Sequence, residues 1–172
     1  PGAEVIGIDR NQAMLDVAAT RIRSPNVSFQ EADALDLPFP DGSFDLVVCQ
    51  FGIMFYPDKV KGNAEARRVL RDGGRYLLAI WDRIENNPLS NLAHETMQRQ
   101  FPSDPPMFMK RGPFSYYDPA WIDRDLRAAG FDSIDIETVE LRSRSPSAED
   151  ATRGLTYGSP MGVELQEYGP GA

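Results

Sequence analysis

The sequence predicts an α/β domain with a mostly parallel sheet, and two observations lead to this fold class. Short, almost continuously apolar segments, typical of strands buried on both faces, alternate with segments whose apolar residues recur at helical spacing. Polar residues, several of them acidic, follow the apolar segments directly, as they do where parallel strands end at a ligand-binding edge. Strands that alternate with helices favour parallel pairing, because each return to the same edge of a sheet needs a crossover.

The N-terminal elements predict one strand–helix–strand unit. Residues 4–9 (EVIGID) are apolar and end in an acid, which indicates the first strand. Residues 11–22 have helical spacing, and Asn11 suits the N-cap because its side chain can accept a hydrogen bond from the first turn. Residues 26–30 alternate in polarity and indicate the second strand.

The next elements complete the expected sheet. Residues 43–51 (SFDLVVCQF) indicate a third strand, whose apolar density places it at the centre. A helix is expected over 57–70, with Pro57 in its first turn and Gly62 as a weak point. Two further elements are expected, a turn at 71–74 (RDGG) and a fourth strand at 75–82 (RYLLAIWD).

The second half of the chain is less regular. Residues 83–117 are rich in proline, asparagine, methionine and aromatic residues, which fits a variable substrate-covering or lid insertion in a single domain over 1–172. The last dozen residues are expected to fray. The remaining expected elements are helices at 88–100 and 118–130, the latter with Asp118 as its N-cap, a strand at 131–141 and a capped helix within 145–160.

The charge balance disfavours polyanionic partners. The chain has 26 acidic and 18 basic residues and a net charge of −8, and the basic residues are scattered. Nucleic acids and anionic membranes require clustered Lys and Arg, so neither is an expected partner. No apolar segment approaches the roughly 20 residues that span a bilayer, and a cytoplasmic protein is expected. The single cysteine, Cys49, excludes an intrachain disulfide, and no metal site is expected.

Asp9 lies where nucleotide-binding α/β folds place an acid, at the end of the first strand. Its two carboxylate oxygens can accept both hydroxyl groups of a ribose. This signal is weak alone, because an acid that merely caps the following helix gives the same pattern. The residues at the carboxyl ends of the four expected strands are Asp9, then Asp33 and Ala34, then Cys49 and Gln50, and finally Trp81 and Asp82.

A longer combination of motifs is more specific. The segment EADALDLPFPDGSFDLVVCQFGIMFYPD (31–58), preceded by VIGIDRNQAMLDVA and followed by ARRVLRDGGRYLLAIWD, closely resembles the class I S-adenosylmethionine-dependent methyltransferases. The likeness is to the small-molecule branch related to the ubiquinone and menaquinone biosynthesis enzymes. It covers residues 3–82, and 112–131 is similar to a later helix of that branch. It implies a Rossmann-like, doubly wound sheet and S-adenosylmethionine as the cofactor.

The resemblance also implies roles for single residues. Asp9 would hold the ribose hydroxyls, and Arg10 would lie along the adenine face. Asp33 would accept a hydrogen bond from the adenine amino group, and the Ala34 N–H would donate to a ring nitrogen. Gln50 would lie near the methionine portion.

A group of aromatic residues is a candidate for the acceptor site, with ordinary packing as the alternative: Phe51, Phe55, Tyr56 and Trp81. No catalytic residue is assigned, because displacement at a sulfonium methyl has a neutral leaving group and depends mainly on orientation. The Asn-Pro-Pro-Tyr type motif of amino-group methyltransferases is absent after the third strand, which favours an oxygen, carbon or other small-molecule acceptor.

Two departures from the family are expected to matter. The glycine-rich loop and the first strand of this fold are not in the sequence, and the final antiparallel pair is incomplete. The chain is therefore expected to be an N-terminally truncated fragment, inactive alone, whose parent is the enzyme. Two alternatives remain: a non-catalytic binding module with a methyltransferase fold, and a nicotinamide-dependent oxidoreductase, although a Tyr-x-x-x-Lys pair is absent.

Overall fold

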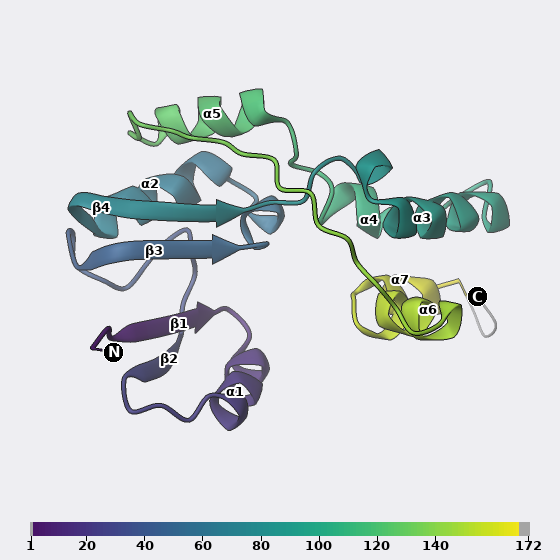
Figure 1. Ribbon diagram of the computed structural model, residues 1–172, viewed down its shortest axis with the longest axis horizontal. Helices are drawn as coiled ribbons and strands as arrows, with labels where there is room; N and C mark the ends of the chain where they lie inside the picture. The colour runs from purple at the N-terminus through teal and green to yellow at the C-terminus, as the bar shows by residue number, and fades with distance from the viewer. Residues whose placement is uncertain (1, 169–172) are drawn as a thin grey trace. The chain divides into compact units, whose positions relative to one another are not determined.

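A parallel pair of strands, β1 (Val5–Asp9) and β2 (Val27–Glu31), forms the N-terminal end of the fold. The computed structural model describes residues 2–168, and Figure 1 traces its elements. Helix α1 (Gln12–Arg21) connects the two strands and packs against both. The Asn11 side chain accepts a hydrogen bond from the Ala13 N–H at 3.0 Å, so the predicted N-cap is confirmed.

A second pair consists of β3 (Phe44–Gln50) and β4 (Leu70–Ala79), which Figure 1 draws as arrows in the same direction. Helix α2 (Lys59–Val69) connects them. Its N-cap is Asp58, which accepts from the Lys61 N–H at 2.8 Å, so Pro57 precedes the helix and the prediction that it lies in the first turn is wrong.

The predicted turn at 71–74 is also wrong, because β4 begins at Leu70, directly after the helix. Strand β4 is the hydrogen-bonded neighbour of β3, and the Arg71 guanidinium lies 2.6 Å from the carboxylate of Asp45 near the start of β3. Gly73 keeps a positive φ of 74°, so the glycine-rich segment retains one turn-like residue inside the strand.

The sheet is in two pieces, β1 with β2 and β3 with β4. Within residues 2–168, β1 and β3 each have a single hydrogen-bonded neighbour. Their apolar sequences are typical of buried strands, yet Val5 is 48% exposed and Val48 is 60% exposed.

The chain divides into two compact units. The first contains most residues up to Leu77, together with Asp125–Phe131, and the second contains Gln50–Phe55, Leu78–Arg124 and the residues after Phe131. The single domain with an insertion at 83–117 stays a prediction.

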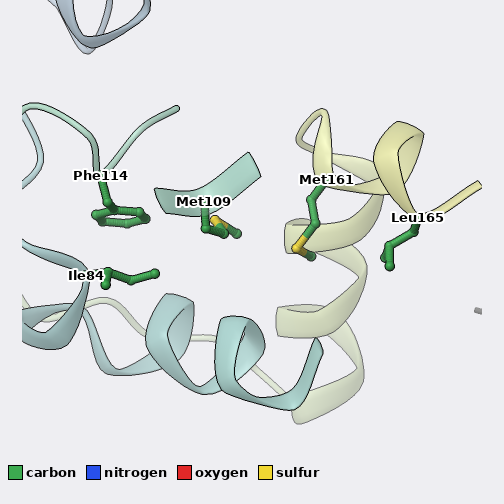
Figure 2. Close-up of a cluster of buried hydrophobic side chains, with 5 residues drawn as sticks. All are labelled: Ile84, Met109, Phe114, Met161 and Leu165. Carbon is green, nitrogen blue, oxygen red and sulfur yellow. The ribbon is translucent and has the colours of Figure 1, made fainter. Parts of the chain in front are cut away.

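The second unit is mostly helical and has its own hydrophobic core. Its core side chains, drawn in Figure 2, are Ile84, Met109, Phe114, Met161 and Leu165. Its elements are the short 3-10 helices η1 (Ile53–Phe55) and η2 (Ile84–Asn86), and the helices α3 (Pro88–Gln100), α4 (Phe108–Arg111), α6 (Ala148–Tyr157) and α7 (Met161–Gln166). Helix α5 (Pro119–Ala128) crosses from one unit to the other.

The helices of the second half confirm the local signals of the sequence. The helix at 88–100 is confirmed as α3. Asp118 accepts from the Ala120 N–H at 2.8 Å, and Ser147 caps α6 by accepting from the Asp150 N–H at 3.0 Å. None of the helices among residues 2–168 has the length and apolar character needed to cross a membrane.

Two expectations for the C-terminal part are wrong. Residues 131–141 form no strand, because no neighbouring edge pairs with them, and Leu141 is 89% exposed. The last dozen residues do not simply fray, because α7 occupies Met161–Gln166; residues 169–172 lie outside the described residues. Glu164 explains this order: its two carboxylate oxygens accept from the Met107 and Phe108 N–H groups, each at 3.0 Å.

His94, the only histidine of the chain, is buried in α3 with 2% of its surface exposed. Its Nε2 has no hydrogen-bond partner. Burial lowers the pKa of the imidazole, and the positive charge of Lys110 lowers it further, against the opposing effect of Glu85, Glu95 and Glu164. The folded state therefore holds His94 neutral at a pH where the unfolded chain would bind a proton.

We expect acid to destabilise the fold through this residue. The pKa of His94 in the folded state lies below its value of about 6.5 in the unfolded chain. The stability that the protein has with neutral His94 is therefore fully present above pH ~6.5 and is lost as the pH falls towards the folded pKa. The free energy of unfolding should fall by up to about 1.4 kcal/mol per pH unit in that window. Urea unfolding at pH 7.5 and 5.5 measures it. The variant His94→Leu should lose most of this pH dependence, and an equal loss in both chains would contradict the assignment.

Candidate functional site

The parallel register of β1 and β2 brings two strand ends to one edge. Asp9 lies opposite Glu31, so the turn that follows β2 begins beside the end of β1. The Ala32 N–H donates to the Asp9 carbonyl at 3.1 Å and continues the pairing by one residue. Asp9 and Asp33 are therefore held at the same edge of the sheet, as the sequence predicts.

Backbone groups fix the orientation of both carboxylates. One oxygen of Asp9 accepts from the Asn11 N–H at 2.8 Å. One oxygen of Asp33 accepts from the Leu35 N–H at 2.9 Å, while the other lies 3.8 Å from Nε of Arg10. Ala34 lies in the same turn, so the structure brings together four of the five predicted cofactor-binding residues.

The loop after this turn is held by two residues that the sequence analysis did not single out, Glu65 and Arg68 of α2. Glu65 accepts from the Leu37 N–H at 2.8 Å. Arg68 donates to the Leu37 carbonyl at 2.9 Å, to the Phe39 carbonyl at 2.7 Å and to the Asp41 carboxylate at 2.8 Å. The signal that could have found them is their three-residue spacing, which puts both on one face of the helix.

The two side chains also bind each other. Arg68 Nη2 lies 2.7 Å from Glu65 Oε2, and Arg68 Nε donates to Oε1 at 2.8 Å. The Arg68 hydrogen bond lowers the pKa of Glu65, assisted by the Leu37 N–H, and the same bond raises the pKa of Arg68. Both groups stay charged at neutral pH.

Tyr56 lies beside the end of β3. Its hydroxyl is 3.5 Å from Sγ of Cys49, the penultimate residue of β3. Burial raises the pKa of the Tyr56 hydroxyl, and Cys49 and the charge of Asp33 raise it further, so Tyr56 is a neutral phenol at physiological pH. Cys49 itself is half-buried.

Gly62 makes room for this tyrosine. A Cβ atom on Gly62 would lie 2.5 Å from Cδ2 and 2.8 Å from Cε2 of the Tyr56 ring, which is closer than side chains pack. The glycine that weakens α2 by propensity is therefore required by the aromatic ring that lies on its backbone.

In the second unit, Phe51 stacks on Trp81, with ring centroids 4.4 Å apart and an interplanar angle of 18°. Phe51 has a positive φ of 55°, which is uncommon for a bulky residue and is typical of functional turns. Its N–H still donates to the Ala79 carbonyl at 2.9 Å. Gln50, the last residue of β3, is exposed.

The four aromatic residues predicted to bind the acceptor are thus divided. Phe51 and Trp81 lie together, whereas Phe55 stacks with Phe108 at 6.4 Å and Tyr56 belongs to the first unit beside Cys49. Their common role stays a prediction. No group of three or more His, Cys, Asp or Glu residues in the described part of the chain is arranged to hold a metal ion.

Comparison with known proteins finds relatives for the N-terminal half of the chain. Residues 1–78 match the family model of a methyltransferase domain. A demethylmenaquinone methyltransferase of Deinococcus radiodurans is 45% identical over 80 residues, which are 45% of this chain and 33% of that protein. The ubiquinone/menaquinone biosynthesis C-methyltransferase UbiE of Pasteurella multocida is 38% identical over 96 residues, 54% of this chain and 36% of the relative. Residues 1–78 thus have the sequence of a methyltransferase domain, and the resemblance to the class I S-adenosylmethionine-dependent methyltransferases is confirmed.

Solved structures support the same fold for this chain. The YcgJ protein of Bacillus subtilis superposes with a TM-score of 0.63 at 26% identity, over 95% of this chain and 65% of that protein. A methyltransferase from Thermotoga maritima superposes at 0.57 with 21% identity, over 77% and 66%. The predicted Rossmann-like α/β class is confirmed. The chain spans only about a third of the length of the two curated relatives above.

The contact between Gly62 and Tyr56 predicts opposite effects for two helix-interior glycines of this protein. Gly62→Ala should lower the free energy of unfolding by about 1–3 kcal/mol, because the Tyr56 ring must move. Gly154→Ala in α6, where a Cβ meets nothing within 4 Å, should raise it by about 0.5–1 kcal/mol through helix propensity. Urea unfolding of both variants measures this, and a stabilised Gly62→Ala variant would contradict the account of Tyr56.

Proposed function

We propose that this protein binds S-adenosylmethionine and transfers its methyl group to a small-molecule acceptor. The observation that carries the proposal is the pair of oriented carboxylates, Asp9 and Asp33, at the ends of two paired parallel strands. These residues lie within the segment that matches the methyltransferase domain. The carboxyl edge of a parallel sheet is where α/β folds bind nucleotides.

Each residue of this edge suits one part of the cofactor. Asp9 has a carboxylate for two ribose hydroxyls, and Asp33 has one for the amino group of adenine. Arg10 is exposed and offers an aliphatic stem for the adenine face, and the Ala34 N–H offers a donor to the ring. Gln50 is assigned to the methionine portion on the family resemblance. When bound, S-adenosylmethionine supplies a sulfonium methyl group whose departure leaves a neutral thioether.

The contribution of the protein to such a transfer is orientation of the acceptor and exclusion of water. Phe51 and Trp81 present stacked aromatic surface after β3 and β4, which suits an acceptor with a flat apolar ring. Two relatives are named for menaquinone biosynthesis, and an acceptor of that general kind fits this surface. No general base is assigned, because Tyr56 is a neutral phenol and His94 is buried in the core of the second unit.

Asp9→Ala should weaken binding of S-adenosylmethionine. Losing charge-assisted hydrogen bonds to the ribose should lower the affinity by roughly ten- to a hundredfold, or about 1.5–3 kcal/mol. Calorimetry on the natural protein that carries this sequence measures the change. Asp16→Ala is the matched control, because Asp16 is an exposed acid on α1 that accepts only from Gln12 in its own helix. Equal affinity of the Asp9→Ala and control proteins would remove Asp9 from the site.

Nucleic acid should not be the acceptor. The net charge of −8 opposes binding to phosphates, and basic residues are scattered along the chain. Mobility-shift measurements with tRNA and duplex DNA at physiological salt should find no complex at micromolar concentrations. A complex of that affinity would replace the small-molecule proposal with a nucleic-acid substrate.

A methyl-transfer assay distinguishes an enzyme from the alternative, a non-catalytic binding module. Transfer of a labelled methyl group from the cofactor to naphthols or hydroquinones supports the enzyme. Cofactor binding with no transfer to such acceptors supports a binding module.

A further inference from the structure

We propose that Glu65 and Arg68 form a clamp that positions the adenine-reading turn at Asp33 and Ala34, so that α2 sets the base selectivity of the cofactor site. This inference rests on the proposed function. Neither residue would touch the cofactor, so both are positioning residues.

The clamp holds the loop at several points along its length. Leu37 is bound twice, with its N–H on Glu65 and its carbonyl on Arg68, at 2.8 and 2.9 Å. Arg68 also reaches the Phe39 carbonyl and the Asp41 side chain. A planar guanidinium with five donors can satisfy such a set of acceptors, whereas the flexible ammonium of lysine cannot hold them in one geometry.

The sequence of the loop explains why it needs an external donor. Pro38 and Pro40 have no N–H, so the loop cannot pair its own carbonyl groups in a regular ladder. Carbonyl groups in a half-buried loop require partners, and Arg68 supplies them. The N–H of Gly42 in turn donates to the Arg68 carbonyl at 2.9 Å, which binds the far end of the loop to the same residue of α2.

A short series of hydrogen bonds links the clamp to the turn. Directly before Leu37, the Asp36 N–H donates to the Asp33 carbonyl at 3.0 Å. The Leu35 N–H donates to the Asp33 carboxylate at 2.9 Å. Leu37 is therefore the fixed point from which the backbone folds back on Asp33, and moving it would shift the carboxylate that reads the adenine amino group.

The clamp differs from the ordinary ion pairs of this protein. Arg71 and Asp45 form one contact at 2.6 Å with side chains that are 65% and 72% exposed, and such a pair contributes little. The Glu65 side chain is 17% exposed, and the Arg68 side chain is 31% exposed. Substituting Arg71 removes the same charge from the same unit without touching the loop, so it is the matched control.

The test is base selectivity. Calorimetry on the natural protein that carries this sequence measures the affinities for two ligands, S-adenosylhomocysteine and S-inosylhomocysteine. In S-inosylhomocysteine an oxo group replaces the amino group of the adenine. The unaltered protein and Arg71→Met should prefer the adenine ligand by about tenfold or more, the value of one charge-assisted hydrogen bond. Arg68→Met should reduce the preference to below about threefold, and Arg68→Lys should give an intermediate ratio.

A merely structural role would weaken both ligands by the same factor and leave the ratio unchanged, and that result would overturn the inference. Hydrogen exchange without ligand provides a second readout. Arg68→Lys should accelerate exchange of the Leu35 and Asp36 amides, neither of which bonds Arg68 directly, and Arg71→Met should not. If the unaltered protein binds neither ligand, the proposed function is contradicted. Hydrogen exchange then tests the clamp by itself, and unchanged exchange rates of the Leu35 and Asp36 amides in Arg68→Lys would overturn it.

Discussion

The in-register pairing of β1 with β2 is the constraint on which the candidate site depends. Backbone N–H and carbonyl groups of a strand must be satisfied, and here five consecutive residue pairs do so in parallel. Because side chains alternate across a strand, a shift of one residue would turn every side chain of β2 to the opposite face. It would also separate Asp9 from the turn that contains Asp33. The geometry of the site thus follows from backbone pairing before any side-chain contact forms.

Local signals in the sequence were sufficient for most helices and for the position of the acids. Asn11, Asp118 and Ser147 cap their helices as their residue types predict, because a cap depends only on its own first turn. Asp9 and Asp33 lie together because parallel strands that follow one another end at the same edge. These features need no information from distant parts of the chain.

The errors arise where the outcome depends on a distant partner. Residues 71–74 have the composition of a turn but belong to β4, which pairs with the distant strand β3. Residues 131–141 have the alternation of a strand but lack an edge to pair with. Glu65 and Leu37 are 28 positions apart. In the sequence, Glu65 and Arg68 look like an ordinary charged pair on a helix, and only the folded loop shows their contact with Leu37. The packing of the Tyr56 ring over Gly62 also joins an aromatic residue to a helix glycine in a way that the sequence does not show.

The carboxylate of Glu164 has a consequence for how the molecule is made. It bonds the N–H groups of Met107 and Phe108 from 57 and 56 positions further along the chain, and the nearby Met161 and Leu165 complete the core of the second unit. During synthesis the helices α3 and α4 leave the ribosome well before α7 exists, so their apolar side chains stay uncovered until residues 161–165 have been made. Contacts of such long sequence separation form late and slow the folding of the unit that needs them. A chain that ends before α7 would have a second unit whose core lacks Met161 and Leu165 and leaves its remaining apolar side chains exposed.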